Sequence, residues 1–110
     1  MDKVEKHKTI CEELTQIYRS KNKDYGDSFT KSFEKYGLTS SAIRLGDKFY
    51  RFENLINEAA LVNDESIEDT LMDMANYCIM TLIEMEENKN TMLQLAGKEL
   101  KRVGELTFDE

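Results

Sequence analysis

The sequence predicts an all-α fold, a compact four-helix bundle. The chain contains no proline, its apolar residues recur with a period near that of a helix, and no segment alternates polar and apolar residues as a half-buried strand does. Its 110 residues suit one domain, since typical domains contain about 100 to 150 residues. We therefore expect a single all-α domain over residues 1–110.

The first predicted helix spans residues 4–21 and ends where turn-forming residues cluster over 22–28. A short helical turn over residues 30–36 follows and is closed by Gly37. A second long helix then runs to about Asn57. Its first turn offers three hydroxyl side chains that can cap it: Thr39, Ser40 and Ser41.

The third predicted helix begins near Ser66, which has an acid, Asp69, three residues later as in a capping box. This helix runs to Glu87. A fourth helix is expected over residues 91–103, where leucines recur at helical spacing, and a tail over 104–110 follows it.

The third helix is apolar over most of its circumference, which is more than a surface helix needs. One of its sides carries five apolar residues: Leu71, Ala75, Cys78, Leu82 and Met85. We expect this helix to be central, with a second copy of the chain covering surface that the other helices leave open, as a homodimer or a higher homo-oligomer. Cys78 and Cys11 are expected to fill the core rather than to form a disulfide or act as nucleophiles.

Two lines of polar side chains stand out on the second and third helices. The third helix carries a stripe with the spacing i, i+4 and i+7: Asp69, Asp73 and Asn76. The second helix carries a charged line with the spacing i, i+3, i+4 and i+7: Arg44, Asp47, Lys48 and Arg51. Buried carboxylates are costly unless they meet a cation or a metal ion, so we expect the two lines to face each other.

Two interpretations of this seam remain open. In the first, the aspartates hold a magnesium ion and the cations neutralise phosphates, as phosphoryl or pyrophosphate chemistry requires. The metal ligands are then Asp47, Asp69 and Asp73, of which Asp69 and Asp73 are catalytic, and Asn76 supports the site. In the second interpretation, the same charges pair with one another as a structural network.

The segment over residues 21–29 mixes cations, an acid, an amide, aromatic residues and a glycine at the end of a helix. Tyr25 or Phe29 can stack on a base or a sugar, and Lys21 or Lys23 can meet a phosphate. The same residues also make an effective helix stop. The expected ligand is a nucleotide or a related phosphorylated small molecule.

The charge and hydropathy of the chain exclude other partners. A net charge of −7 argues against non-specific binding to nucleic acid, which relies on a basic surface. The chain has no apolar run long enough for a membrane span and no secretory signal at its start. We therefore expect a cytoplasmic protein without a membrane partner.

Three segments together resemble a known family: Lys-Asn-Lys-Asp-Tyr-Gly-Asp-Ser-Phe (21–29), Arg-Leu-Gly-Asp-Lys-Phe-Tyr-Arg-Phe-Glu-Asn-Leu (44–55) and Glu-Ser-Ile-Glu-Asp-Thr-Leu-Met-Asp-Met-Ala-Asn-Tyr (65–77). The chain resembles the small phage and prophage proteins grouped as a nucleotide modification associated domain. The resemblance covers about residues 10–85. It implies a nucleotide-linked role in an infected or lysogenic bacterial host.

The layout of acids is also similar to that of the MazG and dimeric dUTPase type of all-α nucleoside triphosphate pyrophosphohydrolases, which hold magnesium with ExxE and ExxD motifs. That resemblance implies a dimer that hydrolyses a nucleotide between its α and β phosphates. Here, however, Asp69 and Asp73 are four residues apart, and the second helix offers Arg-x-x-Asp-Lys over residues 44–48. A relative that sequesters a host nucleotide, such as a cyclic signalling molecule, without cleaving it therefore remains an alternative. A structural or partner-binding bundle with a methionine-rich surface is another.

Overall fold

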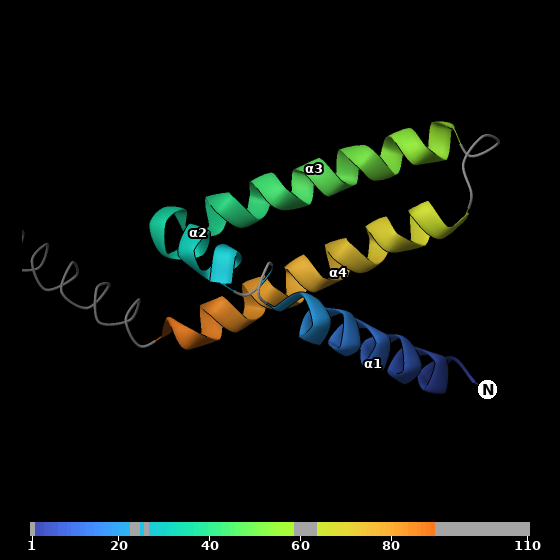
Figure 1. Cartoon of the computed structure of the whole chain (residues 1–110), viewed down its shortest axis with the longest axis horizontal. Coiled ribbons are helices and arrows are strands. Elements are labelled where there is room, and N and C mark those ends of the chain that lie inside the picture. The colour runs from blue at the N-terminus through green and yellow to red at the C-terminus, as the bar shows by residue number, and fades with distance from the viewer. Residues whose placement is uncertain (1, 23–24, 26, 59–63, 90–110) are drawn as a thin grey trace, which may run out of the picture.

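The computed structural model describes residues 2–22, 25, 27–58 and 64–89 of the chain. These described residues form four helices: α1 (Lys3–Asn22), α2 (Ser28–Tyr36), α3 (Leu38–Asn57) and α4 (Asp64–Glu87) (Figure 1). No strand occurs in these ranges, so the prediction of an all-α bundle is confirmed. The helix predicted over 91–103 and the tail over 104–110 lie outside the described residues.

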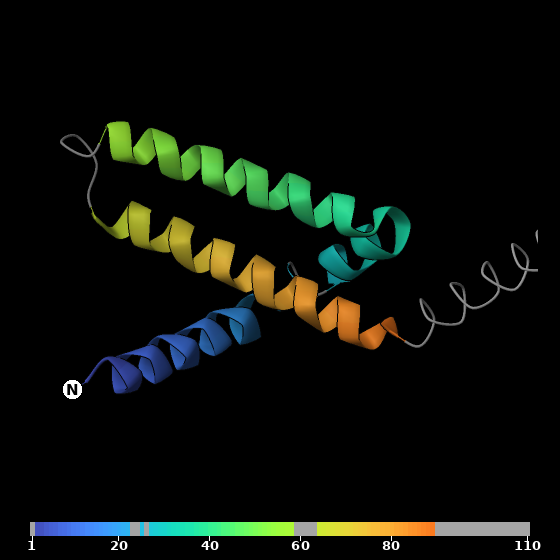
Figure 2. The ribbon, with the colours of Figure 1, turned by 180° about the vertical axis from the view of Figure 1, so that it is seen from behind.

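The helix α4 lies between α3 and α1 in both views of the molecule (Figures 1 and 2). Its most extensive contacts are with α3, which runs alongside it. The short helix α2 touches both α3 and α4, and α1 meets α4 near the middle of its length. The central position expected for this helix is therefore confirmed.

Three contacts fix the antiparallel register of α3 and α4. Thr81 Oγ1 lies 2.9 Å from Ser41 Oγ, the Arg44 guanidinium lies over the ring of Tyr77, and Lys48 pairs with Asp73. Successive contacts lie one helical turn later along α3 and one helical turn earlier along α4, which is the pattern of antiparallel helices. The seam between the two helices carries polar contacts along this whole stretch.

Gly37 joins α2 to α3 without an intervening loop. Its φ of 64° lies in the left-handed region, which glycine adopts at little cost. Its N–H donates to Phe33 O at 2.7 Å, which ends α2, and its carbonyl accepts from Ser40 N at 3.1 Å. For this reason α3 begins at Leu38, earlier than the hydroxyl residues that were expected to cap it.

The buried core gathers where α1, α2 and α4 meet. Its members are Tyr25, Phe29, Phe33 and Met80, with Ile17, Tyr18 and Tyr77 packed against them. Phe29 is the most deeply enclosed, with 1% of its surface exposed. Three of the four buried side chains come from the short stretch between α1 and α3, so that stretch anchors the long helices to one another.

The expected orientation of α4 is wrong in one respect. The side that carries Leu71, Cys78 and Leu82 is exposed, with Leu82 at 64%. The buried positions of α4 are instead mostly polar: Thr70, Asn76, Met80 and Glu84. The reason is that the neighbouring helices cover Asn76 and Glu84 through contacts with Leu14 of α1 and Thr30 of α2, whereas α1 leaves an open groove beside Leu71. Cys11 and Cys78 are both exposed thiols, so the expectation that they fill the core is wrong as well.

None of the described helices combines the length and the apolar character that crossing a bilayer requires.

Replacing Phe29 with alanine should lower the free energy of unfolding by about 3 to 5 kcal/mol, because a large buried ring is lost and a cavity remains. Tyr36→Ala in the same helix is the matched control, since Tyr36 is 60% exposed. Urea unfolding followed by circular dichroism measures both variants. Equal losses in the two would contradict the position of the core.

Candidate functional site

Asp73 on α4 accepts hydrogen bonds from two different segments. Its Oδ2 lies 3.1 Å from Lys48 Nζ on α3, and the side chains of Lys48 and Asp73 are 29% and 22% exposed. Its Oδ1 accepts a hydrogen bond from the hydroxyl of Tyr25, which lies between α1 and α2 and is itself buried. The sequence predicted that the charged line of α3 and the polar stripe of α4 would face each other, and Lys48 and Asp73 meet in this way.

The surroundings shift the pKa values of two of these groups. Burial by itself raises the pKa of Asp73, but the hydrogen bonds from Tyr25 and Lys48 and the nearby charge of Lys21 outweigh it, so the pKa lies below its usual value. Burial and the adjacent carboxylate raise the pKa of the Tyr25 hydroxyl. Tyr25 therefore stays protonated as a donor, and Asp73 stays ionised as an acceptor.

An aromatic cluster supports this site and holds a second cation. The rings of Tyr25 and Phe29 lie 5.6 Å and 5.9 Å from that of Tyr77, measured between centroids. The guanidinium carbon of Arg44 lies 5.5 Å from the Phe29 centroid and 5.8 Å from the Tyr77 centroid. Arg44 also donates to Ser32 Oγ at 3.2 Å. Arg44 is thus held on ring faces, a favourable cation–π arrangement.

Lys21 extends the cationic surroundings of Asp73. Its Nζ lies 5.6 Å from the centroid of the Tyr25 ring, and the residue is exposed. The structure therefore brings five of the predicted site residues into one neighbourhood: Lys21, Tyr25, Arg44, Lys48 and Asp73.

Four other predicted site residues form no hydrogen bond or ion pair with Asp73. Asp47 and Arg51 are exposed on α3, and neither forms an ion pair with any described residue. Asp69 is exposed and lines a groove between α1 and α4. Asn76 is buried and donates to the Leu14 carbonyl at 3.2 Å, which ties α4 to α1. Within the described ranges, no three His, Cys, Asp or Glu side chains are grouped to hold a metal ion, and the predicted magnesium site stays a prediction.

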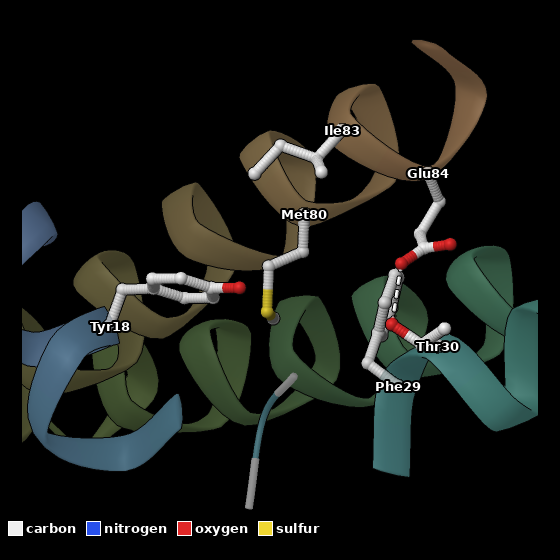
Figure 3. A pocket seen from close by; sticks show the side chains of 6 residues that line it. All are labelled: Tyr18, Phe29, Thr30, Met80, Ile83 and Glu84. Atoms are coloured by element: carbon white, nitrogen blue, oxygen red, sulfur yellow. Dashed lines mark hydrogen bonds between the residues drawn. The ribbon is translucent and has the colours of Figure 1, made fainter. Parts of the chain in front are cut away.

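Sequence reasoning did not identify Glu84, a buried carboxylate near the end of α4. Thr30 donates to its Oε1 at 2.5 Å, and Asn88 Nδ2 lies 3.4 Å from its Oε2. Figure 3 shows Glu84 and Thr30 beside a cavity of about 10 Å³. A cavity of this size is at the lower limit for one water molecule, so it does not accommodate a nucleotide. The available signal was its spacing, since Glu84 follows the partly buried Tyr77 and the buried Met80 on one side of α4.

These features define a small all-α domain with a charged and aromatic site where two antiparallel helices meet a short connecting segment. The model of the family described as nucleotide modification associated domain 1 matches residues 21–85. Because the match covers more than half of the chain, the chain belongs to this family, as its three segments suggested. Searches of curated proteins and of solved structures gave no significant match.

The lowered pKa of Asp73 predicts an acid-dependent contribution to stability. A carboxyl whose pKa is lower in the folded than in the unfolded state stabilises the fold above its unfolded pKa, and this contribution is lost as the pH falls through the folded value. Asp73→Asn should therefore cost about 1 to 2 kcal/mol at pH 7, and the difference from the natural chain should shrink below about pH 4.

Urea unfolding at several pH values between neutral and acid measures this difference. Asp47→Asn is the matched control, because Asp47 is exposed and forms no ion pair within the described part of the chain. Its effect should be small at every pH. A difference for Asp73→Asn that stays constant down to about pH 3 would argue against the ionised contact with Lys48 and Tyr25.

Proposed function

We propose that the protein binds a nucleotide, or a related phosphorylated small molecule, at the seam of α3 and α4 beside Tyr25. Membership of a nucleotide modification associated family supports the class of ligand. The observation that carries the proposal is that most cations of the charged line on α3 lack a carboxylate partner among the described residues. Only one of them, Lys48, has a carboxylate partner among the described residues.

Arg44 gives the strongest support for an anionic ligand among these cations. Its guanidinium is half-buried on the Phe29 and Tyr77 rings, and its hydrogen-bond partner is a neutral hydroxyl. Removing a cation from water without an anion is costly. A guanidinium has five donors in a planar fork that suits a phosphate, so an anionic ligand would compensate Arg44 where the protein does not.

Arg51 provides a second contact point one helical turn beyond Lys48. It is exposed, and it pairs with no described acid, including Asp47. A purely structural network would have used these charges internally, as the second interpretation of the seam expected. Internal pairing accounts for Lys48 alone, which leaves Arg44 and Arg51 to neutralise phosphates, with Lys21 close to Tyr25.

Tyr25 is the candidate for contact with the base or the sugar, but its hydroxyl is bonded to Asp73 and the residue is buried. A phosphate that takes over Lys48 would weaken the Lys48–Asp73 contact and loosen this arrangement. Binding is therefore expected to act on the segment that carries Tyr25. The proposal needs no resident metal ion, and it includes sequestration of a nucleotide without turnover.

Magnesium-dependent hydrolysis between the α and β phosphates remains a prediction from the sequence. It would require Asp47, Asp69 and Asp73 to act on one ion, whereas Asp73 is bonded to Lys48 and Asp69 lines the groove toward α1. Nucleotide-bound magnesium would have to draw these carboxylates together. The same assay tests both activities.

The first experiment is thermal unfolding with a panel of canonical, modified and cyclic nucleotides, with magnesium and with chelator, together with detection of released pyrophosphate. A ligand that binds the folded state raises the apparent stability by mass action. Arg51→Gln should weaken binding about ten- to hundredfold, since one charge-assisted contact is worth about 1.5 to 3 kcal/mol.

Lys8→Gln is the control for Arg51→Gln, because it removes the same charge from an exposed position at the far end of α1. It should leave affinity unchanged. Stabilisation that persists in chelator, without product, supports a binding module. Pyrophosphate release that depends on magnesium and is lost in Asp73→Asn supports hydrolysis. The absence of stabilisation by any phosphorylated ligand would contradict the proposed function.

A further inference from the structure

A groove of about 610 Å³ lies between α1 and the first half of α4. In both views α1 and α3 lie on opposite sides of α4 (Figures 1 and 2), so this groove is separate from the Asp73 site. Its apolar lining comes from both helices: Ile10, Leu14 and Ile17 of α1, with Leu71, Met72 and Ala75 of α4. Three acids, Glu13, Glu68 and Asp69, complete it.

The apolar surface continues beyond the groove along α4. Ile79, Leu82 and Met85 are 41%, 64% and 39% exposed, and they follow Leu71 and Ala75 at helical spacing. The first half of α1 is also uncovered, since every residue from 3 to 13 is exposed. A helical segment as short as residues 3–13 has marginal stability in water when it packs against nothing. Both helices therefore present a face that lacks a packing partner among the described residues.

The charges along α1 show which partner fits this face. Ile10, Glu13 and Ile17 line the groove, and Lys6 and Lys3 continue the same row toward the start of the helix at spacings of four and three residues. The row thus has cations before Ile10 and an acid after it. Such a row is complementary to itself when two copies run antiparallel, which is what a twofold symmetric interface requires.

We propose that this face binds a second copy of the chain, with the two α1 helices antiparallel about a twofold axis near Ile10. Each α1 then covers the groove of the other copy, and Lys6 of one copy lies close to Glu13 of the other. The exposed apolar side of α4 becomes buried in the same contact.

Sedimentation equilibrium with single charge reversals tests this pairing. Lys6→Glu and Glu13→Lys should each weaken self-association about tenfold, because like charges then face each other in both symmetric pairs. An equimolar mixture of the two variants should associate again, since the glutamate introduced in one copy then meets the lysine introduced in the other. Lys8→Glu and Glu12→Lys, which lie on the other side of α1, are the matched controls and should change nothing.

Thiol reactivity provides a second measurement that does not depend on a disruptive variant. In Cys11→Ser, the remaining Cys78 belongs to the exposed side of α4, and it should react with a thiol reagent more slowly as the protein concentration rises. Cys11, monitored in Cys78→Ser, should show little dependence on concentration, because it lies to the side of the groove row.

Recovery of association in the mixed variants, together with protection of Cys78, supports the proposal. A natural chain that is monomeric at every concentration would overturn it. So would a dimer that ignores both charge reversals, because its interface would then lie elsewhere. Nucleotide binding depends on the opposite side of α4, so failure of this proposal would leave the proposed function standing.

Discussion

The contacts of Asp73 hold the described structure together. A carboxylate that is largely withdrawn from water must be paired, and its two oxygens take partners from separate parts of the chain, Lys48 on α3 and Tyr25 before α2. Tyr25 in turn packs against Tyr77, which supports the Arg44 guanidinium. One ionised group on α4 thereby fixes the register of α3, the position of the connecting segment and the placement of a second cation.

The same arrangement explains why the seam combines structural and ligand-binding character. The carboxylate of Asp73 is paired with one cation, Lys48, and one hydroxyl, that of Tyr25. The other cations of α3 therefore remain available to a ligand. Arg44 is held by ring faces and a serine rather than by an acid. A guanidinium positioned in this way is ordered before any ligand arrives, and preorganisation of this kind lowers the entropic cost of binding an anion.

Much of the fold was predictable from the sequence because helix boundaries depend on local signals, such as the turn residues after Lys21 and the glycine after Tyr36. Periodicity also identified the stripes that bring Lys48 to Asp73. It could not tell which side of α4 its neighbours cover. Asn76 and Glu84 are buried because Leu14 and Thr30 bond to them, 62 and 54 residues away. Asp69 and Asp73 differ by about 40° around the helix, enough to place Asp69 at the groove instead of the seam.

The two sides of α4 therefore have different requirements. Its polar side is satisfied within the chain, and no buried side-chain nitrogen or oxygen of the described residues lacks a hydrogen bond. Its apolar side lacks packing partners among the described residues, because Leu71 and Leu82 are exposed to water. Burying apolar surface stabilises a fold in proportion to the area buried. The core within one chain contains only four buried side chains, so covering the apolar side of α4 with a second copy would add substantially to the stability of the fold. The first half of α1 precedes the family match at residues 21–85, whereas Lys48 and Asp73 lie within it. The proposed self-association and the proposed nucleotide site therefore depend on different parts of the chain.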